Sequence, residues 1–469
     1  MNTLAEIIRR EIAQYGPMPF ARFMELALYH SSLGYYEREA ETVGRGGDFF
    51  TNVSVGSVFG ELLAFQFARW LDELKVNPAE LNNWQPVAPL PPHEPGSAGI
   101  PAGAVEAVAL AGKDDGVPSS QVQGFNERMR SENCLLARNK WGEDRGEGKS
   151  SENGPPLPNP LLPLQGRKGE NQVHRESRLL LQIVEAGAHD GRLALDVLSW
   201  FCRHRADLLT QLEYWILEPS TDRQRRQSET LREFDGRFRW FSSWESIPPQ
   251  SIRGVLFSNE LLDSFPVHRL GWDAGERRWF EWAVSWEEGR FGWVKLPTGK
   301  HAQTEPRQTV SGPVLPPELA AALPDGFTSE ISPAAEAWWT QAASRLARGK
   351  LLTIDYGLLA EEFFAPHRAN GTLRAYHRHQ VSSDLLGSAG EQDLTSHVNF
   401  GALQQQGEDA GLRTEGLLPQ SRFLTEIVKQ IERSPQSFAT WTPARLRQLQ
   451  TLVHPEHLGR PFQLLIQSR

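Results

Sequence analysis

LLLQIVEAGAHDGRLALDVLSWFCRHRADLLTQLEYWILEPS, residues 179–220, is the stretch that decides the fold. It begins with a continuous apolar run, Leu179 to Val184, of the kind found in parallel strands that are covered on both faces. A glycine-containing turn follows, and the apolar spacing then predicts a helix that starts at about Arg192. A second apolar run, Tyr214 to Leu217, predicts the next strand. Together they predict one strand, turn, helix and strand unit of an α/β fold.

Acidic residues follow both strands of this unit. Glu185 ends the first strand and Glu218 ends the second. Between them, Gly187 and Gly191 bracket a tight turn where a bulky Cβ would block the approach of a ligand to the backbone. Because Glu218 is expected beside this turn, its carboxylate can accept both hydroxyls of a ribose, which indicates a nucleotide-type cofactor site. An ordinary crossover, whose glycines serve only the turn, explains this motif equally well.

The charge of the turn separates the candidate cofactors. Gly187-Ala188-His189-Asp190-Gly191 lacks the G-x-G-x-x-G spacing of dinucleotide sites and places the Asp190 carboxylate where a phosphate would lie. S-adenosylmethionine has no phosphate and carries a sulfonium and an ammonium group. A site that holds Glu185, Asp190 and Glu218 suits these cations, so the turn favours S-adenosylmethionine over a dinucleotide.

The composition bears on the compartment and on the partners of the chain. Its 469 residues carry 49 Lys and Arg against 58 Asp and Glu, a formal charge of −9, with no dense basic block. This balance disfavours a nucleic-acid partner. The two cysteines, Cys134 and Cys202, cannot form a disulfide framework, which indicates a reducing compartment. Since no apolar run approaches membrane-span length and no signal-peptide core is present, we expect a soluble cytoplasmic protein.

Three regions can be separated along the chain. Residues 1–77 are expected to form a helical segment around a glycine-rich loop. Residues 78–177 are expected to be a low-complexity, disordered insertion, because residues 86–169 hold 12 Pro and 12 Gly but only two aromatic residues. Residues 178–469 should form the α/β domain, with a small β-rich, Trp-rich lobe inserted at about 268–325.

Further apolar runs extend the predicted sheet. They are residues 237–244, 254–267, 349–357 and 462–469. Alternation of these strands with helices predicts a doubly wound α/β sheet. Asn259 and Glu260 stand in a strand-end position like that of Glu185 and Glu218. Open parallel sheets bind ligands at the carboxyl ends of their strands, so the site is expected at that edge.

Several motifs together resemble one protein family. They are GDFFTNVSVGSVFGELLA at 47–64, VEAGAHDGRLALDVL at 184–198, FSNELLDSFPVHR at 257–269, SEISPAAEAW at 329–338 and GEQDLTSHVNF at 390–400. These segments resemble the MidA-like family of class I S-adenosylmethionine-dependent methyltransferases. Mitochondrial members of that family are protein arginine methyltransferases needed for respiratory complex I assembly. The resemblance covers nearly the whole chain except the insertion.

The resemblance implies a Rossmann-like methyltransferase sheet and S-adenosyl-L-methionine as the cofactor. It also implies an arginine of a protein partner, such as a respiratory-complex subunit, as the methyl acceptor, and a homodimer is a further expectation. The loop with Gly47, Asp48 and Thr51 is expected to close over the cofactor, alongside Gly187, Gly191 and Asn259 as further contacts. The chain departs from the family at His189, where the turn usually has its middle glycine, and at Asn52, where a serine is usual.

The chemistry of methyl transfer suggests roles for a few side chains. Transfer from a sulfonium is an in-line displacement, so the protein mainly positions donor and acceptor. An arginine acceptor is held by carboxylates through bidentate hydrogen bonds. Glu260 is the first candidate for this clamp, supported by Asn259 and Asp263, although Glu260 could instead cap a helix that starts at Leu261. His397 is a candidate acceptor for the released proton, because of its family position and because histidine is in general a suitable proton acceptor.

Other functions stay open at this point. The acceptor could be a small molecule or another protein, and the chain could be a cofactor-binding assembly factor with little turnover. A dinucleotide oxidoreductase is disfavoured by the charge of the turn. His377 and His379 alternate as metal ligands can, but no Cys or carboxylate stands at metal-site spacing, so no metal is assigned.

Overall fold

The structure, a computed structural model, describes residues 4–37, 51–74, 180–296, 310–377 and 380–469. All of these described residues belong to one compact unit. The predicted insertion at 78–177 lies outside the described residues.

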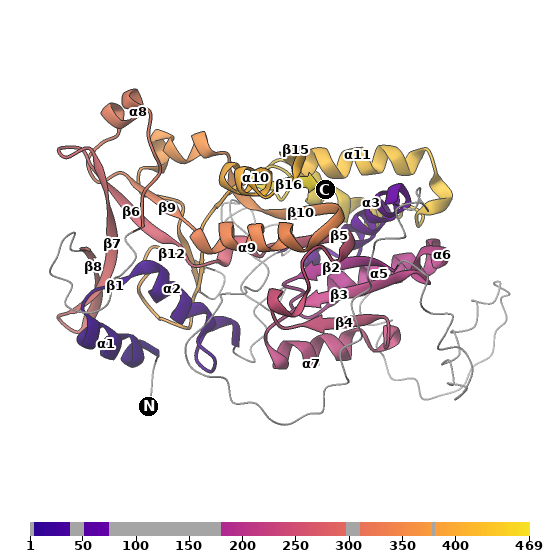
Figure 1. The fold of residues 1–469 in the computed structure, drawn as a ribbon, viewed down its shortest axis with the longest axis horizontal. Coiled ribbons are helices and arrows are strands. Elements are labelled where there is room, and N and C mark those ends of the chain that lie inside the picture. The colour runs from indigo at the N-terminus through magenta and orange to yellow at the C-terminus, as the bar shows by residue number, and fades with distance from the viewer. Residues whose placement is uncertain (1–3, 38–50, 75–179, 297–309, 378–379) are drawn as a thin grey trace. The chain divides into compact units, whose positions relative to one another are not determined.

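An eight-stranded mixed sheet forms the centre of this unit (Figure 1). Its order is β15-β16-β10-β5-β2-β3-β4, and β14 pairs with β10 as well. The bounds are β2 Leu181–Ala186, β3 Leu212–Leu217, β4 Phe238–Phe241, β5 Ile252–Asn259, β10 Leu346–Leu358, β14 Val398–Asn399, β15 Arg413–Pro419 and β16 Phe462–Ser468. The strands from β10 to β4 run parallel, whereas β16 is antiparallel to both of its neighbours. The carboxyl ends of β2, β3, β5 and β10 therefore meet at one edge.

Helices cover both faces of this sheet, which confirms the predicted doubly wound α/β class. Successive strand side chains point to opposite faces, so Ile183 enters one core and Val184 enters the other. The first core is packed by α3 Val58–Leu74, α5 Arg192–His204, α11 Gln420–Glu432 and α12 Pro443–Val453. The second is packed by α9 Pro333–Arg345 and α10 Phe400–Asp409. The short helices α6 Ala206–Leu209 and α7 Thr221–Thr230 flank β3 in the chain.

The predicted β-rich lobe is a five-stranded antiparallel sheet. Its strands are β1 Met18–Pro19, β6 His268–Asp273, β7 Arg278–Glu287, β8 Arg290–Lys295 and β9 Thr328–Ile331. Helices α1 Leu4–Tyr15 and α2 Phe20–Tyr29 bury their apolar sides with this sheet in a third core. The lobe therefore extends beyond the predicted range of about 268–325, because β1 comes from the N-terminal segment and β9 lies after residue 325. A two-residue strand has no periodicity that a sequence pattern could show.

Three more strands and a helix complete the described strands and α-helices. They are β11 Arg374–His377, β12 Gln380–Ser382, β13 Asp393–Thr395 and α8 Pro317–Ala322. The strands form a small antiparallel sheet in the order β12-β11-β13.

Strand β5 ends at Asn259, where the sequence places its polar end. The run 254–267 stops as a strand at Asn259, and a 3-10 helix, Leu262–Ser264, follows. The break occurs because Glu260 adopts a left-handed backbone conformation with φ of 50°, which cannot continue a strand. The polar strand end is therefore a sharp corner.

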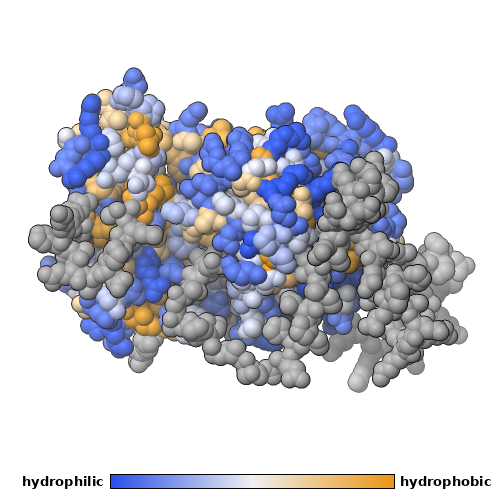
Figure 2. All heavy atoms as spheres, viewed as in Figure 1, coloured by the Kyte–Doolittle hydropathy of each residue, from blue (hydrophilic) through white to orange (hydrophobic). Residues whose placement is uncertain are grey.

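The described surface is mostly hydrophilic, with apolar side chains in small separate groups on the face that Figure 2 shows. The large exposed apolar residues come from separate segments: Tyr15, Val314, Leu359, Val381 and Leu446. In the described part of the chain, no helix has the length and apolarity that crossing a membrane requires.

Candidate functional site

The turn between β2 and α5 is built on left-handed backbone conformations. Gly187 has φ of 73° and Gly191 has φ of 84°, where a residue without Cβ carries no steric strain. A Cβ on Gly191 would lie at an ordinary 3.4 Å from Gln227 Cα, so conformation rather than space calls for glycine there. His189 also has a positive φ, 47°, at a cost of about 1 kcal/mol or more. The turn therefore stores strain at the residue that departs from the family pattern.

Glu218 lies beside this turn, as predicted. Its carboxylate is fully buried and accepts hydrogen bonds from the Ser220 backbone N–H at 3.0 Å and from Gln227 Nε2 at 3.1 Å. Gln227 Nε2 also donates to the main-chain oxygen of His189 at 3.0 Å, and Gln227 Oε1 accepts from Trp240 Nε1 at 2.8 Å. Gln227 thus joins the strand end to the turn. Its helix, α7, is polar throughout, and nothing in the sequence singles this glutamine out.

Burial dominates the ionisation of Glu218. Desolvation raises the pKa of its carboxyl from 4.5 to about 7, although the charge of Arg223 and the Ser220 N–H oppose that rise. Glu218 therefore titrates near neutral pH.

Glu185 is buried inside the sheet, one residue before the end of β2. The hydroxyl of Tyr214 donates to its Oε2 at 2.5 Å. Burial raises the pKa of Glu185 to about 8, because desolvation outweighs that hydrogen bond. Near neutral pH this side chain is largely protonated. Its position fits the polar end of the strand that the sequence predicts.

Asp190 behaves in the opposite way. Its carboxylate forms an ion pair with Arg192 Nε at 2.9 Å and accepts the Arg192 backbone N–H at 3.2 Å. Burial would raise the pKa of Asp190, but His189 and Arg192 outweigh burial and lower it. The turn therefore carries an ionised, paired carboxylate.

Glu260 and Asn259 form a buried network at the corner after β5. Glu260 Oε1 accepts the Asn52 backbone N–H at 2.9 Å and Asn259 Nδ2 at 3.1 Å. Asn52 Nδ2 donates to Asn259 Oδ1 at 3.3 Å, and Gln420 Nε2 donates to Asn52 Oδ1 at 2.8 Å. The network fastens the segment after the glycine-rich loop to the end of β5. Asn52 and Gln420 were not among the predicted site residues.

Thr51 is buried and serves a local turn in this segment. Ser54 donates its backbone N–H to Thr51 Oγ1 at 3.1 Å, and Thr51 donates its backbone N–H to Ser54 Oγ at 2.8 Å. The other two predicted residues of the loop, Gly47 and Asp48, lie outside the described residues.

The corner after Glu260 is capped by a different acid, Asp355 of β10. Asp355 Oδ2 accepts the backbone N–H groups of Leu261 at 3.0 Å, Leu262 at 2.8 Å and Asp263 at 3.4 Å. Burial raises the pKa of Asp355 to about 7 against these hydrogen bonds. Asp355 therefore supplies the cap that was considered as the alternative role of Glu260. Asp355 could have been suspected only as an acid near the end of an apolar strand.

Asp263 and the segment of His397 lie together on the lobe side of this corner. The buried Asp263 accepts the Ser396 backbone N–H with its main-chain oxygen at 2.9 Å. His397 donates its backbone N–H to Thr372 Oγ1 at 3.1 Å, and Thr372 Oγ1 donates to Glu330 Oε2 at 3.0 Å. His397 and Glu330 line a cavity of about 20 Å³, enough for about one water molecule.

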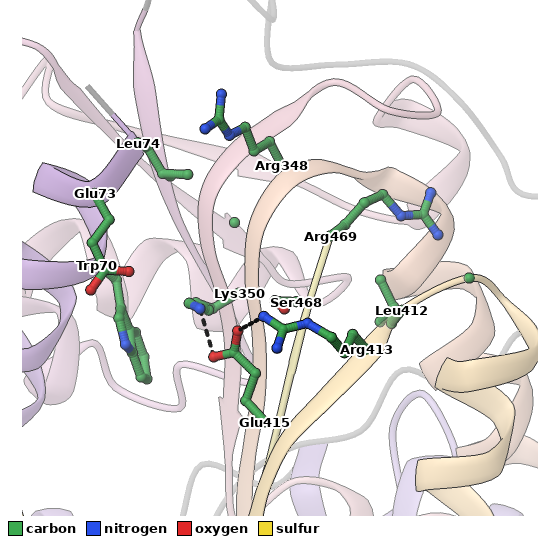
Figure 3. A pocket seen from close by; sticks show the side chains of 12 residues that line it. Trp70, Glu73, Leu74, Arg348, Lys350, Leu412, Arg413, Glu415, Ser468 and Arg469 are labelled. Atoms are coloured by element: carbon green, nitrogen blue, oxygen red, sulfur yellow. Dashed lines mark hydrogen bonds and ion pairs between the residues drawn. The ribbon is translucent and has the colours of Figure 1, made fainter. Parts of the chain in front are cut away.

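A larger cavity, of about 580 Å³, lies at the other edge of the sheet, where β10 begins and β16 ends. Glu415 forms two ion pairs there (Figure 3). Its Oε2 lies 2.6 Å from Lys350 Nζ, and its Oε1 lies 2.8 Å from Arg413 Nη2. None of the predicted site residues lines this cavity. Within the described ranges, no group of three or more His, Cys, Asp or Glu could hold a metal ion.

Comparison with known proteins gives matches over most of the chain. A family model described as "Putative S-adenosyl-L-methionine-dependent methyltransferase" matches residues 171–418. A candidate methyl transferase from Burkholderia thailandensis, solved with S-adenosyl-homocysteine bound, has a TM-score of 0.64 at 24% identity. That match covers 99% of this chain and 92% of the other. A second structure from the same organism has a TM-score of 0.62, also at 24% identity, covering 99% and 91% of the two chains. At this identity the two structures show the shared fold.

Two curated relatives match a short segment. The mitochondrial protein arginine methyltransferase NDUFAF7 homolog of Drosophila melanogaster is 38% identical over 62 residues, and the NDUFAF7 enzyme of Danio rerio is 36% identical over 62 residues. Each match spans 13% of this chain and 14% of the relative.

Proposed function

Because this chain belongs to the family of S-adenosyl-L-methionine-dependent methyltransferases, we propose that it methylates an arginine side chain of a partner protein. S-adenosyl-L-methionine follows from the family itself. The arginine acceptor is supported by the names of the two mitochondrial relatives. It is also supported by the buried carboxylates of Glu260 and Asp263 beside the carboxyl edge.

Glu218, Gln227 and the glycine turn between β2 and α5 together form what we call the ribose corner, and this corner fits the cofactor. Each Glu218 oxygen accepts one hydrogen bond from the protein, and a carboxylate oxygen can accept a second, so both ribose hydroxyls can be held. Gly187 and Gly191 allow close approach to the backbone. Asp190 and Glu185 complete the proposed cofactor contacts. The bound cofactor supplies an electrophilic methyl group on its sulfonium.

One observation carries the proposed acceptor site, the strained and buried Glu260. A non-glycine residue with φ of 50° is costly, and such strain collects at functional sites. Its carboxylate is held by Asn52 and Asn259, so it is pre-oriented before an acceptor arrives. We assign Glu260 to hold the acceptor guanidinium, with Asn259 and Asp263 in support. His397 is the proposed acceptor of the released proton.

The test is transfer of a labelled methyl group from S-adenosyl-L-methionine to proteins of the source cell. Mass spectrometry of the labelled products should locate the methyl group on an arginine. A label on a small molecule, or on another side chain, would establish the alternative acceptor. Tight cofactor binding without transfer to any fraction would instead favour an assembly factor with little turnover. The backbone strain at His189, in the cofactor turn, is the observation that favours this second function.

Three finer expectations stay predictions. They are a respiratory-complex subunit as the partner, a homodimer and a cytoplasmic location. Both curated relatives are mitochondrial by name, so location is best tested by imaging the tagged protein in its own cell.

A further inference from the structure

A buried cation lies at the ribose corner. Arg223, in the first turn of α7, is only 5% exposed. Its Nη2 donates to the main-chain oxygen of Tyr36 at 2.7 Å, and its Cζ lies 5.8 Å from the centroid of the Tyr36 ring. Its Nε has no hydrogen-bond partner among the described residues. Burial of a guanidinium is unfavourable unless its charge is compensated nearby.

Compensation comes from Glu218 and Glu37. The positive charge of Arg223 is stabilised by both carboxylates and also faces Tyr29 and Arg226. Within the described residues, Arg223 makes no direct ion pair with Glu218, whose oxygens bond the Ser220 N–H and Gln227. The guanidinium therefore acts on the carboxylate through space and leaves its acceptor sites to a ligand.

The other side of Arg223 holds the N-terminal segment. Tyr36 belongs to the 3-10 helix Tyr35–Glu37, and its hydroxyl donates to Asp393 Oδ1 at 3.0 Å. The ring of Tyr29 stacks on that of Tyr36 with centroids 5.5 Å apart. Tyr29 donates its hydroxyl to the main-chain oxygen of Ser264 at 2.8 Å. The two tyrosines thus connect Arg223 to the residues that follow Asp263.

We propose that Arg223 is a positioning residue that fastens the N-terminal segment to the ribose corner and holds Glu218 as the anion that accepts both ribose hydroxyls. This inference rests on the proposed cofactor role of Glu218. It predicts that cofactor binding depends on a residue that need not touch the cofactor.

The electrostatics of the corner give this proposal a pH signature. Burial raises the pKa of Glu218 to about 7, while Arg223 and the Ser220 N–H lower it and Glu37 raises it. Loss of the guanidinium therefore raises the pKa of Glu218 further. A protonated Glu218 cannot accept two hydroxyl groups as well as the anion can, so affinity should fall most at low pH.

The experiment compares Arg223→Met with Arg225→Met, an exposed arginine of the same helix that pairs with Asp222. Calorimetry measures two ligands from about pH 6 to about pH 9: S-adenosyl-homocysteine, and 5′-methylthioadenosine, which keeps the ribose but lacks the amino-acid carboxylate. For Arg223→Met, a rise of about one unit in the pKa of Glu218 should weaken the binding of both ligands by about fivefold at pH 7 and by about tenfold at pH 6. The loss should shrink toward high pH, and Arg225→Met should bind as the parent does.

A conservative variant separates the two parts of the role. Arg223→Lys should restore the pH profile, because it keeps the charge, and Glu218→Gln should abolish the pH dependence in either background. Loss of S-adenosyl-homocysteine binding alone would show that Arg223 contacts the amino-acid part, and an unshifted pH profile would show that it does not act on Glu218. Either result overturns the proposal. A parent protein that binds neither ligand would instead contradict the proposed function, and melting curves identify any variant that fails to fold.

Discussion

Both edges of the central sheet carry glutamates, but these glutamates differ in burial and in the direction in which their pKa is shifted. At the carboxyl edge Glu218 is fully buried, and burial raises its pKa to about 7. At the amino edge (Figure 3) the side chain of Glu415 is 24% exposed and contacts Lys350 and Arg413. Burial opposes ionisation there too, but Lys350, Ser468 and Arg413 outweigh burial and lower the pKa of Glu415.

This difference shows how a ligand-binding acid can be distinguished from an acid that only forms a stabilising ion pair. An acid that is paired with cations has its charge already compensated and gains little from a ligand. An acid that is buried with hydrogen-bond donors but without a contacting cation can still be stabilised by a ligand that brings a positive charge or further donors. The carboxyl edge holds Glu218, Glu185 and Asp355 in this second state, whereas Asp190 of the glycine turn is paired with Arg192. This contrast explains why the larger cavity at the amino edge is not our proposed site.

The largest effect is expected for Glu260→Gln at the carboxyl edge. Glutamine keeps the oxygen that accepts the Asn52 N–H, so the corner should stay folded while the negative charge is lost. We expect methyl transfer to fall by about a hundredfold or more with cofactor affinity nearly retained, as for an interaction made mainly in the transition state. Single-turnover rates and calorimetry measure the two quantities. A variant that transfers methyl groups at the parent rate would remove Glu260 from catalysis.

A somewhat smaller effect is expected for Glu218→Ala. Loss of two charge-assisted hydrogen bonds to the ribose should weaken S-adenosyl-L-methionine binding by about 30-fold or more. The dissociation constant is measured by calorimetry, with Glu415→Gln from the amino edge as the matched control. An unchanged constant in a folded variant would reject the ribose role and leave the two edges functionally alike.

Glu185 should reveal itself in the pH dependence of stability. Its pKa in the folded protein, about 8, is above the usual 4.5, so its stabilising contribution is present at low pH and is lost as the pH rises toward 8. The slope is the change in the free energy of unfolding with pH. Glu185→Gln should reduce it by up to about 1.4 kcal/mol per pH unit, which is a factor of ten in the unfolding equilibrium constant per unit. Denaturant unfolding from about pH 5.5 to about pH 8.5 measures the slope. Equal slopes in the variant and the parent would contradict the assigned burial effect.

The smallest effect is expected at the amino edge. Glu415→Gln loses partly exposed ion pairs with Lys350 and Arg413, which typically contribute about 1 kcal/mol or less. We expect a slightly lower free energy of unfolding and an unchanged cofactor affinity. A marked loss of cofactor binding would mean that the amino edge takes part in function, and the comparison would fail.

Local patterns were sufficient for much of the fold. The helices α2, Phe20–Tyr29, and α3, Val58–Leu74, lie in the segment that is predicted to be helical, and α5 begins at Arg192 as expected. Strand β3 ends immediately before Glu218. Periodicity and glycine positions act over a few residues, so they can be read without knowledge of the packing.

The corner at Glu260 shows where local patterns stop. The sequence predicts a polar strand end at Asn259 and Glu260, and β5 does end at Asn259, but the residue that caps the corner is Asp355 of another strand. The partner of Glu260 is Asn52, which lies 208 residues earlier in the chain. Such a contact depends on how α3 and its preceding turn pack on the sheet, and no local spacing records it.

The sequence by itself determined the α/β class, the glycine turn and the acids that end its strands, because each of these follows from neighbouring residues. Only the tertiary structure decided what those acids contact: Gln227 at Glu218, Asn52 at Glu260 and Tyr214 at Glu185. It also decided their ionisation, because desolvation and distant charges act through space rather than along the chain. The same reason places Arg223, unremarkable in a polar helix, at the centre of the ribose corner.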